Sequence, residues 1–139
     1  RNYPRMVRLL LGRSPARTIE GAILELTSGR VWTPAARDAL LDAWCLYRED
    51  SPVSTANAVR QLIAAARYRA PAQPPPIPML LLASAGDGPV DSECSRRLAH
   101  AWHVPLALHP SAGHDLPLDD PSWVIDQIIA WSSAPSRQG

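Results

Sequence analysis

Two residues suited to acid–base chemistry follow two short apolar runs near the C-terminus. Asp87 comes after the run at residues 79–83, and His114 comes after the run at 106–108, on a turn that contains Gly113. Short apolar runs are typical of strands buried on both faces of a parallel sheet. A carboxylate at one strand end can orient a histidine at the next, and that histidine can act as a general base. The sequence therefore predicts Asp87 and His114 as candidate catalytic residues.

Other acidic residues near these turns have structural interpretations. Asp91 is a rival for the acid, but it precedes a predicted helix and suits an N-cap. Asp115 adjoins His114 in sequence and is therefore badly placed to orient that ring. Asp119 and Asp120 suit a helix cap and a partner of the helix dipole. The pair itself has the alternative interpretation of two ordinary turn residues.

The remaining histidines give weaker signals. His100 and His103 are three residues apart on or near one predicted helix, with Cys94 before them, but a metal site needs a further ligand of definite geometry. We therefore predict no metal site. His109 ends a predicted strand and is expected to pack beside the following loop. The five tryptophans suit packing, and they are not interleaved with a basic patch, which disfavours nucleic-acid binding.

Length and composition indicate one globular domain. The chain has 139 residues, a formal net charge of +1 and no apolar run of membrane length, so we expect neither nucleic acid nor a membrane span. Cys45 and Cys94 are expected to be free thiols in a reducing compartment, which favours the cytoplasm; one disulfide is the alternative. Because the sequence starts at Arg1 rather than Met, we expect part of a longer product, and the lack of a visible secretory signal therefore carries little information.

The sequence of the first half of the chain predicts a layer of helices. Helices are expected over residues 5–11, from Ser14-Pro15, from Thr33-Pro34 and from near Ser54, because a small polar residue, often followed by proline, favours a helix start. Their apolar stripes need a surface to cover. Residues 70–78 are rich in proline and predict an extended connector, with a polyproline ligand as the alternative.

The second half predicts alternating strands and helices. The strand at residues 79–83 is followed by a helix that Asp91 or Ser92 caps, a strand at 104–108 and a last helix that opens at Asp120-Pro121. Two strands joined through a helix predict a right-handed parallel unit. The last helix is expected to direct five apolar side chains inward: Val124, Ile125, Ile128, Ile129 and Trp131.

The residues from Pro78 to the end resemble the C-terminal part of the α/β-hydrolase superfamily. In that family the acid and then the histidine of the catalytic triad follow successive strands. The resemblance lies in Asp87 with Val90 after it, and in Gly113-His114 followed by Asp115-Leu116-Pro117. Ser84 departs from the pattern, because the family usually has glycine at this strand end.

The resemblance implies an α/β fold class, with the C-terminal half of a hydrolase fold behind a helical cap. It implies a cap region at residues 1–69, a linker at 70–78, a β-α-β-α part of the core at 79–134 and a tail at 135–139. Asp87 would be the acid and His114 the base of a carboxylesterase-like reaction on a small acyl or ester substrate. No cofactor is implied.

The nucleophile of that family is absent from this sequence. Its serine lies in G-x-S-x-G on a strand-to-helix turn, and residues 82–86, Leu-Ala-Ser-Ala-Gly, have leucine where the first glycine is required. The family order would place the serine and the oxyanion hole before Arg1. We therefore expect an enzyme in the intact protein and an inactive chain by itself, whose core the N-terminal half or self-association covers.

Two alternatives remain open from the sequence. The chain could be a non-catalytic binding or scaffold protein that reuses the fold, since a fold alone does not fix a function. It could also be one chain of a two-chain hydrolase whose partner supplies the serine. A G-x-S-x-G motif upstream would favour the single-chain enzyme, and a co-purifying N-terminal fragment would favour the two-chain form.

Overall fold

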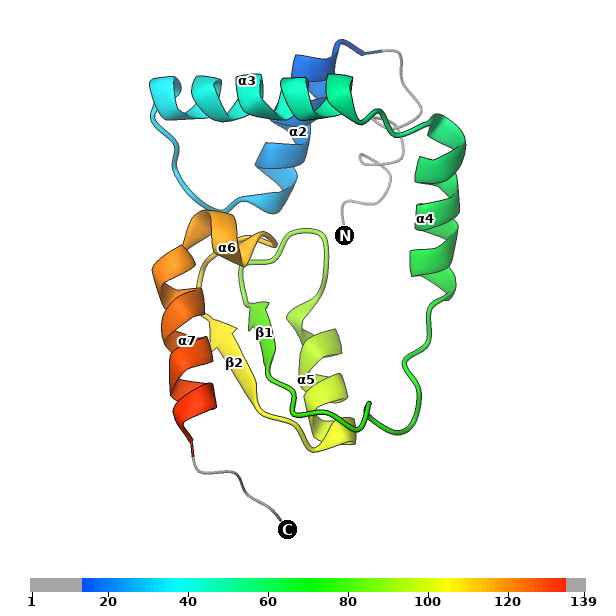
Figure 1. The fold of residues 1–139 in the computed structure, drawn as a ribbon, viewed down its shortest axis with the longest axis vertical. Coiled ribbons are helices and arrows are strands. Elements are labelled where there is room, and N and C mark those ends of the chain that lie inside the picture. The colour runs from blue at the N-terminus through cyan, green and yellow to red at the C-terminus, as the bar shows by residue number, and fades with distance from the viewer. Residues whose placement is uncertain (1–13, 135–139) are drawn as a thin grey trace. The chain divides into compact units, whose positions relative to one another are not determined.

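The computed structural model describes residues 14–134, in which helices precede a small strand-and-helix arrangement (Figure 1). The helix expected at 5–11 and the tail at 135–139 lie outside the described residues. The elements, in order, are α2 (Ala16–Thr27), α3 (Pro34–Asp50), α4 (Thr55–Arg67), β1 (Leu81–Ser84), α5 (Ser92–Trp102), β2 (Leu106–His109), α6 (Leu116–Asp119) and α7 (Pro121–Ser133).

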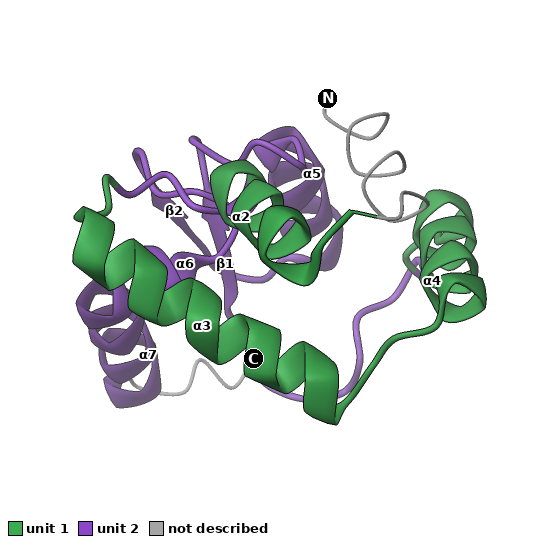
Figure 2. Ribbon diagram, turned by 90° about the horizontal axis from the view of Figure 1, so that it is seen from above, with its two compact units in different colours: residues 1–26, 31–70 green, residues 27–30, 71–139 purple. Residues whose placement is uncertain are grey.

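The chain divides into two compact units, coloured separately in Figure 2. Among the described residues, the helical unit comprises residues 14–26 and 31–70, and it holds most of α2 together with α3 and α4. The sheet unit comprises residues 71–134 and the short segment 27–30. No local signal in the sequence indicated that residues 27–30 belong with the sheet unit.

Small polar side chains begin α3 and α4 of the helical unit as predicted. The Thr33 hydroxyl accepts a hydrogen bond from the Ala36 amide at 3.3 Å, and the Ser54 hydroxyl accepts one from the Asn57 amide at 3.2 Å. Each cap satisfies an amide that has no partner inside its helix. Pro34 follows at the first position of α3, where its missing N–H costs nothing.

The helical unit packs around a few apolar side chains and a partly buried ion pair. Leu24, Leu41 and Ala58 are buried, and the buried Glu20 carboxylate accepts a hydrogen bond from the Arg48 guanidinium. The sequence predicts an apolar face on α3 that includes Leu41 and Leu46, and this prediction is wrong at the end of the helix, since Leu46 is 64% exposed. Residues near a helix end can continue an apolar stripe after the surface that it covers has ended.

The sheet unit contains two parallel strands, which confirms the predicted strand–helix–strand connection. Leu81 pairs with Leu106 and Ser84 with His109, and α5 packs against both strands. Figure 1 shows the strands between α5 and α7. The prediction that both strands are buried on both faces is wrong for most of this sheet, since Leu81 and all of β2 are only half-buried. Two strands leave two open edges, so neither strand has neighbours on both sides.

The first and last helices of the sheet unit also begin as predicted. The Asp91 carboxylate accepts from the Glu93 amide at 3.0 Å, and the Asp120 carboxylate accepts from the Trp123 amide at 3.0 Å. Trp102 at the end of α5 is buried, and its indole N–H donates to the Pro71 carbonyl at 2.9 Å. This contact joins the Pro-rich segment to the far end of α5.

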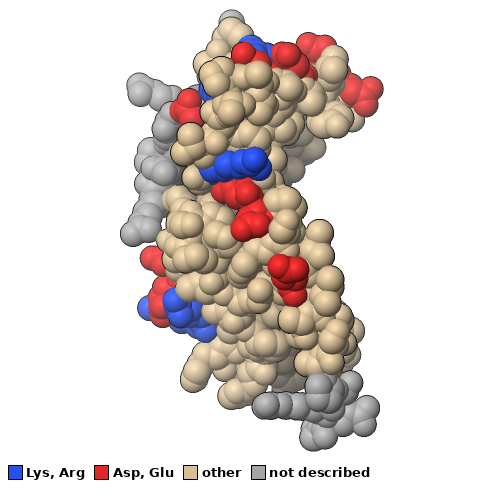
Figure 3. Space-filling view, turned by 90° about the vertical axis from the view of Figure 1, so that its left-hand side faces the viewer, with Lys and Arg blue, Asp and Glu red and all other residues tan. Residues whose placement is uncertain are grey.

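The predicted inward face of α7 is not buried in this structure. Ile125, Ile128 and Ile129 are 55%, 47% and 56% exposed, and α7 contains no buried residue. Its one charged residue is Asp126, and the surface around α7 is largely uncharged in Figure 3. The described residues form a sheet of only two strands, which is too narrow to cover this helix. Between residues 14 and 134, none of the helices is long and apolar enough to cross a bilayer.

Candidate functional site

The candidate site lies where the two parallel strands end. Ser84 and His109 are the last residues of β1 and β2 and stand opposite each other in the sheet. The Ala85 amide then donates to the His109 carbonyl at 2.9 Å, and the Asp87 amide donates to the Ser84 carbonyl at 3.4 Å. The backbone thus turns sharply after β1 and directs the Asp87 side chain toward the loop after β2.

The structure brings the two predicted site residues together. The Nδ1 atom of His114 lies 2.8 Å from Oδ2 of Asp87. The other carboxylate oxygen, Oδ1, accepts a hydrogen bond from the Val90 amide at 2.8 Å. Because both oxygens are engaged, the carboxylate has a fixed orientation. The Asp87 side chain is 13% exposed, whereas that of His114 is 47% exposed.

This geometry fixes what the His114 ring can do. A carboxylate accepts hydrogen bonds, so the neutral ring donates from Nδ1 to Asp87 and keeps an unprotonated Nε2. A lone pair on Nε2 can take a proton from a nucleophile and return it to a leaving group. The partial exposure of the ring leaves room for a reacting group beside it.

Asp119 holds the loop that precedes His114. Its Oδ2 atom accepts from the Gly113 amide at 2.6 Å and from the Gly29 amide at 2.6 Å, and its carboxylate also accepts from the Ser28 hydroxyl. Burial alone would raise the pKa of Asp119, but the hydrogen bonds from Ser28, Gly113 and Gly29 lower it below the ordinary value of 3.8. A single carboxylate therefore joins residues 28 and 29 to the loop.

Two glycines allow the backbones of this site to approach one another. A Cβ atom at Gly113 would lie 2.3 Å from the Thr27 carbonyl oxygen, and one at Gly86 would lie 2.5 Å from the Ala112 carbonyl oxygen. In both cases the obstacle is backbone, which cannot rotate away as a side chain can. The glycine before His114 is therefore required by close packing.

We expect Asp119→Asn to lower the free energy of unfolding of the sheet unit by about 2 kcal/mol at pH 7, because hydrogen bonds to a charged acceptor are lost. The folded-state pKa of Asp119 is lowered, so its contribution is present above the unfolded value and lost as the pH falls through the folded one. Urea unfolding at several pH values should show the two proteins converging in acid. The matched control is Asp126→Asn at an exposed position of α7, and equal losses in both variants would contradict the assignment.

The Ser84 side chain connects the end of β1 to the loop that precedes His114. It is 2% exposed; its hydroxyl donates to the Ala112 carbonyl and accepts from the Gly86 amide at 3.1 Å. A hydroxyl committed to these contacts is not available as a nucleophile. Sequence alone could not show this structural hydrogen bond between the Ser84 hydroxyl and the Ala112 carbonyl.

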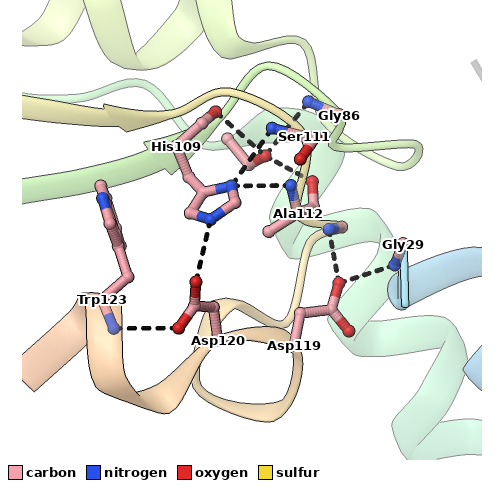
Figure 4. Close-up of polar contacts among 10 residues, drawn as sticks. Gly29, Gly86, His109, Ser111, Ala112, Asp119, Asp120 and Trp123 are labelled. Carbon is pink, nitrogen blue, oxygen red and sulfur yellow. Dashed lines mark hydrogen bonds and ion pairs between the residues drawn. The ribbon is translucent and has the colours of Figure 1, made fainter. Parts of the chain in front are cut away.

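The sequence indicated that His109 packs beside the following loop, but its ring also makes polar contacts. Its ring accepts hydrogen bonds from the Ser111 and Ala112 amides and faces Asp120 (Figure 4). Sequence reasoning missed this role, although the spacing offered a signal: a histidine at a strand end can bond to the amides two and three residues later.

The other residues considered from the sequence lie away from the pair or have local roles. Asp91 and Asp115 both serve as N-caps. The rings of His100 and His103 are 6.3 Å apart, and within residues 14–134 no group of three or more His, Cys, Asp or Glu side chains is arranged to hold a metal ion. Cys45 is half-buried, and both it and Cys94, which is exposed, are free thiols.

The helical unit has a shallow hollow of its own, of about 250 Å³. Its carboxylate, that of Glu20, is already paired with Arg48. The hollow therefore presents no uncommitted charge to a ligand. Its lining residues are Glu20, Trp44, Tyr47, Arg48, Ser51 and Val53.

The comparisons with known proteins found no relative of this chain. No protein-family model matches the chain, and neither a curated protein nor a solved structure is significantly similar to it. A function can therefore be inferred only from the residues at the strand ends and from their geometry.

Proposed function

We propose that this chain supplies the acid and the base of a serine hydrolase with the α/β-hydrolase fold, acting on a carboxylic ester. The single observation that supports it most is the 2.8 Å contact between Nδ1 of His114 and the fixed carboxylate of Asp87. The order of acid and histidine, each after one of two parallel strands, is the order in that fold.

In the proposed reaction, a serine oxygen attacks the ester carbonyl and its proton moves to Nε2 of His114. Asp87 stabilises the resulting imidazolium through Nδ1. The bond from the carbonyl carbon to the alcohol oxygen then breaks, and His114 gives its proton to the departing alcohol. Water attacks the acyl-enzyme with the same proton relay and restores the serine.

The serine and the oxyanion donors are proposed to come from other residues of the same protein or from a second chain. G-x-S-x-G is absent from the 139 residues, and the Ser84 hydroxyl is buried and bonded. We therefore expect the isolated chain to be inactive. The apolar stripes of the helices favour a hydrophobic acyl or alcohol group, and the free thiols favour the cytoplasm.

The exposed apolar face of α7 and the open sheet edges suit a covering partner. We propose that the N-terminal half of the hydrolase fold, or failing that a second copy of the chain, packs there. The observations that favour a partner are the exposed isoleucines of α7 and a sheet of only two strands.

The isolated 139-residue chain is therefore expected to bind an apolar fluorescent dye and to self-associate as its concentration rises. Dye fluorescence and sedimentation velocity measure the two effects. Ile128→Glu on the exposed face of α7 should weaken both, whereas Val31→Glu, at a residue 95% exposed, serves as the control. A monomer that binds no dye would contradict the need for a partner.

A non-catalytic binding or scaffold role is the second candidate, and the absence of G-x-S-x-G favours it. One experiment separates the two. The protein is isolated with the residues that flank this sequence naturally and with any co-purifying polypeptide, and p-nitrophenyl butyrate turnover is measured beside the isolated chain. We expect turnover in the first preparation only. No turnover in either would favour the binding role.

A further inference from the structure

The last residue of β2, His109, directs its ring at the loop that follows the strand (Figure 4). Its Nδ1 atom accepts from the Ser111 amide at 3.1 Å and from the Ala112 amide at 2.8 Å. Its Nε2 atom lies 3.4 Å from Oδ2 of Asp120. The side chain is 12% exposed, so this largely buried ring has partners at both nitrogens.

These contacts set the protonation of the ring. A ring nitrogen that accepts two N–H groups carries no proton, so the neutral ring holds its proton on Nε2, where it faces Asp120. The pKa of Asp120 is lowered, first by the hydrogen bond from the Trp123 amide and then by His109, which keeps the carboxylate charged. Trp123 packs edge-on against the ring, with centroids 5.0 Å apart.

The loop is held at successive backbone atoms. The buried Ala112 has its amide bonded to His109 and its carbonyl bonded to the Ser84 hydroxyl. The Gly113 amide is bonded to Asp119. The next residue along the chain is the proposed base, so three side chains from different parts of the sheet unit fix the backbone just before it.

We propose that His109 is a positioning residue: its Nδ1 acceptor fixes the loop so that the His114 ring faces Asp87. This inference rests on the proposed function, since the orientation of His114 affects turnover only if it is the base. His109 acts through the backbone of Ser111 and Ala112, and its role is distinct from that of the dyad itself.

Two variants separate the two nitrogens of His109. His109→Asn places an amide oxygen near the position of Nδ1, where it can accept the loop amides, but it is too short to reach Asp120. His109→Gln places its amide near Nε2, where it can reach Asp120, but leaves no acceptor near Nδ1. Both are compared with the unaltered chain by amide hydrogen exchange at Ala112 and by ring ¹⁵N shifts of His114.

We expect His109→Asn to retain slow exchange at Ala112 and the Nδ1-protonated form of His114. In His109→Gln, the Ala112 amide should exchange about tenfold faster, because it has lost its hydrogen bond. The His114 ring of this variant should shift toward the Nε2-protonated form. Retention of both signals in both variants would overturn the proposal. Loss in both would also overturn it, because the size of the ring rather than its acceptor would then matter.

These readouts keep the inference separate from the proposed function. They need no nucleophile and can be made on the 139-residue chain. An ester-inactive natural protein would end the hydrolase proposal and leave the hydrogen-exchange result standing. If the protein is active but the His114 tautomer is unchanged in His109→Gln, only the positioning role is ruled out.

Discussion

Replacing His114 by alanine is expected to lower kcat for ester hydrolysis by about 10⁶-fold in the active protein, the scale found when a triad histidine is removed. The serine would lose the group that takes its proton, and the leaving alcohol would lose its proton donor. KM should change little, because the ring contributes mainly to the transition state. Steady-state kinetics with p-nitrophenyl butyrate measure both constants.

His100→Ala is the matched control for that variant. His100 is exposed in the last turn of α5 and belongs to the same sheet unit, but it lies on the helix rather than at the strand ends. It should retain full turnover. If a folded His114→Ala protein kept its kcat, His114 would not be the base and the proposed function would fall.

Replacing Asp87 by asparagine is expected to lower kcat by about 10⁴-fold, as it does where the triad carboxylate loses its charge. Asparagine can still accept the Val90 amide through its oxygen, so the turn after β1 should persist. The amide nitrogen facing His114 cannot accept from Nδ1, so the ring would favour the wrong tautomer. The pH dependence of kcat and the ring ¹⁵N shifts of His114 report these two effects.

Asp91→Asn provides the control because Asp91 is the rival acid. Its carboxylate caps α5 through the Glu93 amide, and asparagine is an equally good N-cap. We expect normal turnover in this variant. If Asp91→Asn lost more ester turnover than Asp87→Asn, Asp91 rather than Asp87 would be the acid.

Local signals in the sequence predicted the element starts and the candidate pair. Thr33, Ser54 and Asp91 each cap the helix that the sequence predicted, because capping involves only residues two or three positions apart. The meeting of Asp87 and His114 was also predictable, since parallel strands joined by a helix end at the same edge.

Contacts between distant segments could not be predicted. Asp119 binds Ser28 and Gly29, about 90 residues earlier, and no local pattern marks such a partnership. The apolar periodicity of α7 correctly predicted a helix, but periodicity does not say what covers an apolar face. Ile125 and Ile129 remain exposed because the sheet formed by the described residues has only two strands.

Asp87 and His114 are proposed to activate a serine that the 139 residues do not supply. The most direct measurement is labelling of the natural protein with a fluorophosphonate, which forms an oxygen–phosphorus bond to an activated serine and releases fluoride, followed by mass spectrometry of the adduct. We predict one adduct, on a serine in G-x-S-x-G outside this sequence, lost in His114→Ala and retained in His100→Ala. Absence of an adduct, or an adduct that forms equally fast in His114→Ala, would contradict the account.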